Sequence, residues 1–140
     1  SADRRPIALK ARALWISLYQ LDEVVNRHDL ALDAFAKSIT GKDTLRFCLN
    51  GEVAKVVEAL KAWAERVGWI GGTRPPLSLV RLQYQRLLAA ECAVGNWVRD
   101  PADLPRRTDK ELSEIADAMG AAIRRLQLGD RHKSPSQQGT

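Results

Sequence analysis

Apolar residues recur every three or four positions through most of this sequence, and this spacing is what most limits the folds open to the chain. The spacing places these residues on one stripe of a helix, whereas a strand would require alternation. Residues 53–67 show the helical spacing most clearly, because alternation would put Lys55 and Lys61 on the same face as Val53 and Val57. The pattern therefore predicts helices throughout and an all-α fold.

Five segments carry this period, and residues that end or begin helices lie between them. Gly41 and Gly68 follow the second and third segments, and glycine readily takes the left-handed conformation that ends a helix. Thr108 and Glu111 have the spacing of a capping box, in which each side chain bonds the other residue's free backbone N–H. We expect helices over residues 6–21, 32–39, 53–67, 77–92 and 108–126.

A stretch rich in glycine and proline, residues 68–76, cannot continue a helix and divides the chain. Its 140 residues suit about one ordinary domain, so we expect a compact bundle of five or six helices, or alternatively two helical subdomains. The final residues are polar and lack periodicity, which predicts disorder. The expected parts are a helical half at 1–70, a connector at 71–76, a second half at 77–128 and a disordered tail at 129–140.

Side chains that catalysis and metal binding require are scarce in this chain. It has two histidines and two cysteines, without the spacing of a zinc site or of a nucleophilic triad. Residues 68–72 lack the lysine of a phosphate-binding loop. We therefore predict no enzyme, no catalytic residue, no metal site and no cofactor. A small helical isomerase or lyase would require Arg12, Arg81 and Glu91 to converge in a buried pocket.

The charge balance makes an acidic partner worth considering. The chain has 22 basic and 17 acidic residues, a net charge of +5, and such an excess is typical of proteins that meet nucleic acid. The excess is spread over an N-terminal arm and several loops, however, and most surface charges are simply solvated. This spread weakens the case for DNA binding. The candidate nucleic-acid contacts are Arg4, Arg5, Lys10, Arg12, Lys42 and Arg46.

The tryptophans divide into core candidates and one candidate for a partner surface. Trp15 and Trp63 lie on or beside apolar stripes, so we expect both to pack in the core. Trp69 comes directly after the stop at Gly68, and we expect it to be exposed and to contact a partner.

No apolar run approaches the roughly 18 residues that a membrane-spanning helix needs. The first residues also lack the apolar core of a secretion signal. We therefore expect no membrane association and a location in the cytoplasm.

Several runs in the first half occur in an order and at a spacing that resemble one known family. They are Arg12-Ala13-Leu14-Trp15, Thr40-Gly41, Leu45-Arg46-Phe47 and Val56-Val57-Glu58-Ala59-Leu60-Lys61-Ala62-Trp63. Over residues 7–67 the chain resembles the GemA family, regulatory proteins of Mu-like phages and prophages. The resemblance implies a small, all-helical, non-enzymatic phage protein that modulates host DNA transactions, namely replication, gyrase activity or transcription. It supplies no catalytic residues.

The function that we expect is regulation by binding inside the bacterial host. The partner is either DNA or a host protein that handles DNA. The alternative is a protein-interaction module that makes no contact with nucleic acid, and the sequence leaves homo-oligomer formation open.

Overall fold

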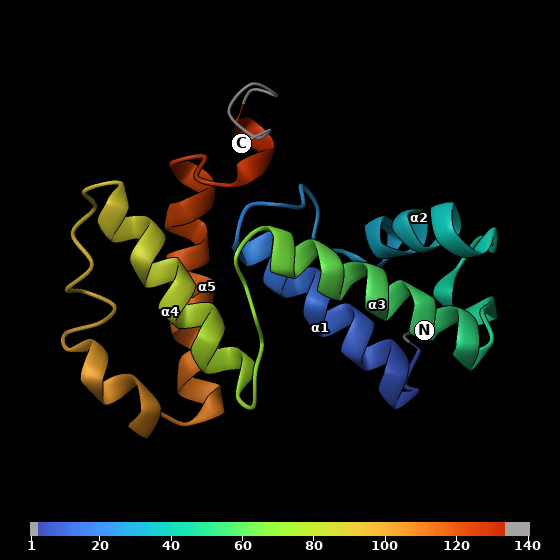
Figure 1. The fold of residues 1–140 in the computed structure, drawn as a ribbon, viewed down its shortest axis with the longest axis horizontal. Coiled ribbons are helices and arrows are strands. Elements are labelled where there is room, and N and C mark those ends of the chain that lie inside the picture. The colour runs from blue at the N-terminus through green and yellow to red at the C-terminus, as the bar shows by residue number, and fades with distance from the viewer. Residues whose placement is uncertain (1–2, 134–140) are drawn as a thin grey trace. The chain divides into compact units, whose positions relative to one another are not determined.

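The structure, a computed structural model, describes residues 3–133 of the chain. These residues form five α-helices and three short 3-10 helices, and no strand occurs among them (Figure 1). The predicted all-α fold class is confirmed. The α-helices are α1 (Pro6–Gln20), α2 (Asp29–Thr40), α3 (Asn50–Arg66), α4 (Pro75–Ala89) and α5 (Asp109–Arg125), and the 3-10 helices are η1 (Leu45–Phe47), η2 (Pro101–Arg106) and η3 (Asp130–His132).

The chain forms two compact units, and it passes between them three times. Among the described residues, the first unit contains residues 3–19 together with Val24–Arg66, and the second contains Gln20–Glu23 and residues 67–133. The four residues that follow Tyr19 therefore belong with the second unit. The sequence pattern gave no sign of this exchange, because residues 20–23 comprise the end of the helix predicted over 6–21 and the start of the loop after it.

The core of the first unit is built from α1, α2 and α3 around three aromatic rings. The ring centroid of Trp15 lies 5.5 Å from that of Phe35 and 6.3 Å from that of Trp63. Trp15 is buried, and its Nε1–H donates to the backbone oxygen of Asn26 at 2.9 Å, which satisfies the polar atom of the ring. Trp63 is half-buried and packs edge-on against Trp15. The predicted core packing is confirmed for Trp15, whereas Trp63 contacts the same rings but stays half-buried.

The second unit is centred on α4 and α5, which pack against each other. Figure 1 shows the two helices running in about the same direction, because the connection that contains η2 returns the chain to the start of α5. Leu87 of α4 and Leu112, Met119 and Ile123 of α5 are fully buried. The predicted capping box is present at the start of α5, where Thr108 and Glu111 bond each other's backbone N–H. This core follows directly from the helical period of the apolar residues.

The prolines of the expected connector belong to a helix. Pro75 and Pro76 lie in the first turn of α4. Proline has no backbone N–H, and the N–H groups of a first turn have no partner within the helix, so proline loses no hydrogen bond there. The connector is therefore shorter than the sequence suggested.

The expected exposure of Trp69 is wrong. Only 5% of this residue is accessible, and its Nε1–H donates to Ser78 Oγ of α4 at 2.9 Å. Gly68 has a φ of 97°, a left-handed conformation that glycine adopts without strain, and there the chain leaves α3. The turn at Gly68 thus brings the indole ring back to α4 instead of leaving it in solvent.

The expectation of disorder from residue 129 onward fails for residues 129–133. This segment contains η3, and it bonds to residues 22 and 23. Residues 134–140, the rest of the expected tail, lie outside the described residues.

Candidate functional site

The first unit contains a surface hollow with a volume of about 270 Å³. The first half of α1, the first turns of α2 and the segment 44–47 surround it. Its lining combines apolar side chains with both signs of charge. The lining residues are Asp3, Ala8, Arg12, Asp29, Leu32, Asp33, Thr44, Leu45, Arg46 and Phe47.

Two aspartates of α2 fix the polar side of this hollow. Asp29 accepts two hydrogen bonds from Arg12, one from Nε and one from Nη2, both at 2.9 Å. Such a two-pronged contact holds a guanidinium in one orientation. Asp33 Oδ1 accepts from the backbone N–H of Leu45 at 2.9 Å and so positions the start of η1. Both aspartates are therefore used to build the hollow.

The apolar side of the hollow ends in an exposed aromatic ring. Leu32 and Leu45 are buried, whereas Phe47 is 67% exposed. The nearby Leu49 is also exposed. Water thus covers most of an aromatic ring that lies at the edge of a concave surface.

Three of the six cations predicted to contact nucleic acid are engaged within the first unit. Arg5 donates to the backbone oxygens of Leu45 and Cys48, at 2.9 and 2.7 Å, and pairs with Asp3 at 2.6 Å. Arg12 pairs with Asp29, as described above. Lys42 Nζ lies 3.2 Å from Glu52 Oε1. These cations hold segments of the fold together.

The other three cations lie on the surface. Arg4 and Lys10 are exposed, and Arg46 is exposed at the rim of the hollow. The ammonium of Lys61 on α3 lowers the pKa of Lys10 on α1, so these two like charges lie close together. Contact of the six predicted residues with nucleic acid stays a prediction.

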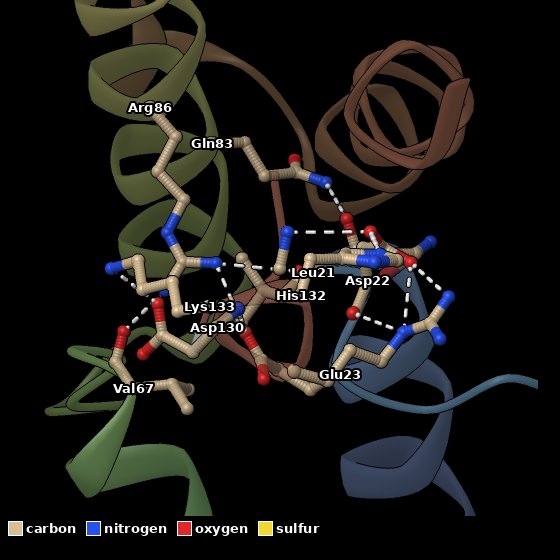
Figure 2. Close-up of polar contacts among 12 residues, drawn as sticks. Leu21, Asp22, Glu23, Val67, Gln83, Arg86, Asp130, His132 and Lys133 are labelled. Carbon is tan, nitrogen blue, oxygen red and sulfur yellow. Dashed lines mark hydrogen bonds and ion pairs between the residues drawn. The ribbon is translucent and has the colours of Figure 1, made fainter. Parts of the chain in front are cut away.

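A second polar cluster, in the second unit, escaped the sequence analysis (Figure 2). Its centre is Asp22, which is fully buried and has a left-handed backbone with φ 61°. Its carboxylate accepts from Arg131 Nη2 at 2.9 Å and from the Gly129 amide at 3.3 Å, and it lies 2.7 Å from His132 Nε2. Arg124 of α5 adds a fourth partner, with Nη1 at 3.5 Å.

The adjacent Glu23 joins the same cluster to α4. It accepts from the backbone N–H of Asp130 at 2.8 Å, and Arg86 Nη1 lies 3.4 Å away. Arg86 also donates to the backbone oxygens of Leu21 and Val67 (Figure 2). One arginine of α4 thus fixes the backbone on both sides of the cluster.

The two carboxylates of this cluster differ in their ionisation. Burial opposes the charge on Asp22, but hydrogen bonds from Arg131, Gly129 and His132 outweigh it and hold the pKa of Asp22 below 3.8. Burial raises the pKa of Glu23 above 4.5, against the opposing effect of the Asp130 amide. The charged form is therefore favoured at one carboxylate and disfavoured at its neighbour.

The three residues that the enzyme hypothesis would require belong to different units. Arg12 pairs with Asp29, while Arg81 and Glu91 are exposed. Within residues 3–133, no group of three or more histidine, cysteine, aspartate or glutamate side chains is placed to hold a metal ion. No helix in this part of the chain is long and apolar enough to cross a membrane.

The comparison with known proteins concerns the first half of the chain. No curated protein and no solved structure matches the sequence. Three of the runs that carry the predicted resemblance meet in one unit: Arg12 and Leu45–Phe47 line the hollow, and residues 56–63 lie within α3. The family described as Bacteriophage Mu, GemA protein, matches residues 1–66 and so confirms the predicted similarity of this segment to GemA.

Proposed function

We propose that the protein is a phage or prophage regulator that acts by binding a host protein which handles DNA, without catalysing a reaction. Its effect would be on replication, gyrase activity or transcription. One observation carries the proposal: residues through which the chain is similar to GemA form a hollow that has an exposed phenylalanine at its edge.

The exposed ring favours a protein partner. Interface energy is concentrated in a few anchors, often aromatic, that fill pockets and are surrounded by polar contacts. Phe47 is an anchor of this kind, and complete burial of such a side chain contributes about 1.5–3 kcal/mol. The hollow beside it, with both signs of charge at Arg12, Asp29 and Arg46, offers a site for a complementary side chain of the partner.

The internal ion pairs argue against DNA as the direct partner of the predicted cations. Phosphate binding by Arg12 or Lys42 would require each to leave its own carboxylate, Asp29 or Glu52. An affinity for DNA therefore depends on the remaining surface charges. The proximity of Lys10 and Lys61 is the observation that favours this second candidate function.

Capture from a nuclease-treated bacterial lysate tests the proposal. The wild-type chain should retain a host protein, and Phe47→Ala should retain at least about tenfold less, as expected for the loss of an aromatic anchor. Ile70→Ala is the matched control, because Ile70 is 70% exposed but belongs to the second unit. This control should bind like the wild type.

Two results would contradict the proposal. Equal capture by Phe47→Ala and the wild type would exclude the hollow as the binding surface. Loss of all partners after nuclease treatment would instead indicate DNA, and a gel shift at about 50 mM salt that weakens steeply as salt rises would then identify direct phosphate contact.

A further inference from the structure

The segment Gly129–Lys133, which we call the C-terminal segment, lies over the turn formed by Asp22 and Glu23. It has no large apolar side chain, since its residues are glycine, aspartate, arginine, histidine and lysine. Arg131, His132 and Lys133 are exposed. Hydrogen bonds and ion pairs join this segment to the turn, and the segment offers no large apolar side chain for burial.

The backbone of the segment nevertheless fits the turn closely. Gly129 is buried, and a Cβ added there would overlap the backbone carbonyl group of Asp22. The amides of Gly129 and Asp130 donate to the carboxylates of Asp22 and Glu23, respectively. A residue without a side chain therefore lies at the point where the two segments approach most closely.

Basic side chains surround this pair of acids from three elements. Asp22 faces Arg131 and His132 of the segment as well as Arg124 of α5. Glu23 faces Arg86 of α4. Removal of the segment would take Arg131 and His132 away from Asp22 and leave Arg124, and a buried carboxylate without partners is costly.

Opening of the segment does not require the helices to unfold. The stability of α4 and α5 comes from buried apolar side chains such as Leu87 and Ile123, none of which belongs to the segment. Segments that bury few apolar side chains open at a lower free energy than packed helices do. The two parts therefore differ in the kind of interaction that stabilises them.

We propose that Gly129–Lys133 is a latch that opens and closes over the Asp22–Glu23 turn while α4 and α5 remain folded. The closed latch covers two carboxylates and engages Arg131 and His132. The open latch uncovers the acidic turn and releases the side chains of Arg131 and His132 to solvent. The charge on Asp22 keeps the latch closed, so a change that removes this charge or one of its cationic partners favours the open state.

Amide hydrogen exchange in the full chain tests this proposal directly. The Gly129 and Asp130 amides report latch opening because they are bonded to the turn, and the Met119 and Ile123 amides report unfolding of α5. In the wild type, the first pair should exchange at least about tenfold faster than the second after correction for intrinsic rates. Arg131→Ala should accelerate the first pair about tenfold more, and the Met119 and Ile123 amides should remain the slower pair.

Two further variants serve as a control and as an independent way to remove the ion pair. Arg125→Ala, which removes an exposed arginine at the end of α5, should leave the Gly129 and Asp130 amides unaffected. Asp22→Asn should accelerate them as Arg131→Ala does, since asparagine keeps the shape of the side chain and tolerates the left-handed backbone. The proposal is wrong if all four amides exchange at one rate, or if Arg131→Ala leaves the latch amides at the wild-type rate.

Discussion

Asp22 shows how one buried carboxylate can determine the position of a distant segment. Its left-handed backbone lies just beyond the last residue of α1, and its side chain is inaccessible to solvent. Because a buried charge must be paired, partners have to come from elsewhere in the chain. Arg131 and His132, about a hundred residues later, provide them. The side chain of Asp22 and the C-terminal segment thus depend on each other.

Substitution of Gly129 by alanine should destabilise the protein. A Cβ at this residue would overlap the backbone of Asp22, and such overpacking costs about 1–3 kcal/mol. Urea unfolding of the variant should show this loss. Gly51→Ala is the control, since a Cβ at Gly51 would meet no atom within 4 Å, and its stability should equal or slightly exceed that of the wild type. Equal stability of the two variants would show that the close approach at Gly129 is easily relaxed.

At the scale of the helices, the sequence was sufficient to predict the features that depend on residues close together in the chain. The apolar period of α5 places Leu112, Met119 and Ile123 on one face, and the structure buries all three. The capping box at Thr108 follows from two residue types at a fixed spacing. Local preference and tertiary packing agree in this helix, so the pattern alone predicts it.

The sequence was insufficient to predict the features that depend on contacts between residues far apart in the chain. Trp69 was expected in solvent because it follows a helix stop, but the direction of the chain after Gly68 brings it to Ser78. The hollow likewise depends on the meeting of Arg12 with Asp29 and of Asp33 with Leu45. Periodicity assigns faces to helices and does not say which faces pair, so none of these contacts was predictable.

The capping box supplies a prediction at this scale. Thr108→Ala removes the side-chain acceptor of the Glu111 amide and should lower the free energy of unfolding by about 1 kcal/mol. Ser113→Ala, an exposed change in the body of α5, provides the comparison. Thermal or urea unfolding of both variants measures the difference. A Thr108→Ala chain as stable as Ser113→Ala would mean that water replaces the cap without cost.

At the scale of the whole molecule, the GemA-like segment and the first unit are not the same set of residues. The match and the first unit both extend to residue 66, but Gln20–Glu23 belong to the second unit. The segment therefore contributes Asp22 and Glu23 to a cluster whose cations come from residues beyond the match, Arg86 and Arg131 among them. The polar core of the second unit thus combines residues from both halves of the sequence.

This cluster links the stability of the molecule to pH, with two opposing contributions. The pKa of Asp22 is lowered on folding, so its stabilising effect is present above pH 3.8 and is lost as the pH falls through its folded value. The pKa of Glu23 is raised, so its contribution is present below pH 4.5 and is lost as the pH rises through its folded value.

Surface carboxylates add to the effect of Asp22. Hydrogen bonds from the backbone amides of Leu49 and Thr108 lower the pKa of Glu52 and Glu111, respectively. Their contributions also disappear on acidification. Acidification therefore removes the contributions of Asp22, Glu52 and Glu111, whereas protonation of Glu23 opposes this loss.

Asp22→Asn removes the buried charge of Asp22 and so measures its contribution to the pH dependence of stability. At neutral pH the variant should be less stable than the wild type by about 1.5–3 kcal/mol, the range for hydrogen bonds to a charged group. The difference should shrink as the pH falls below 3.8 and Asp22 of the wild type takes up its own proton. Urea unfolding at pH steps between about 2.5 and 7 measures it, spanning the titration of carboxyl groups. A difference that stays constant across these steps would show that the shape of the side chain, and not its charge, holds the latch and the turn together.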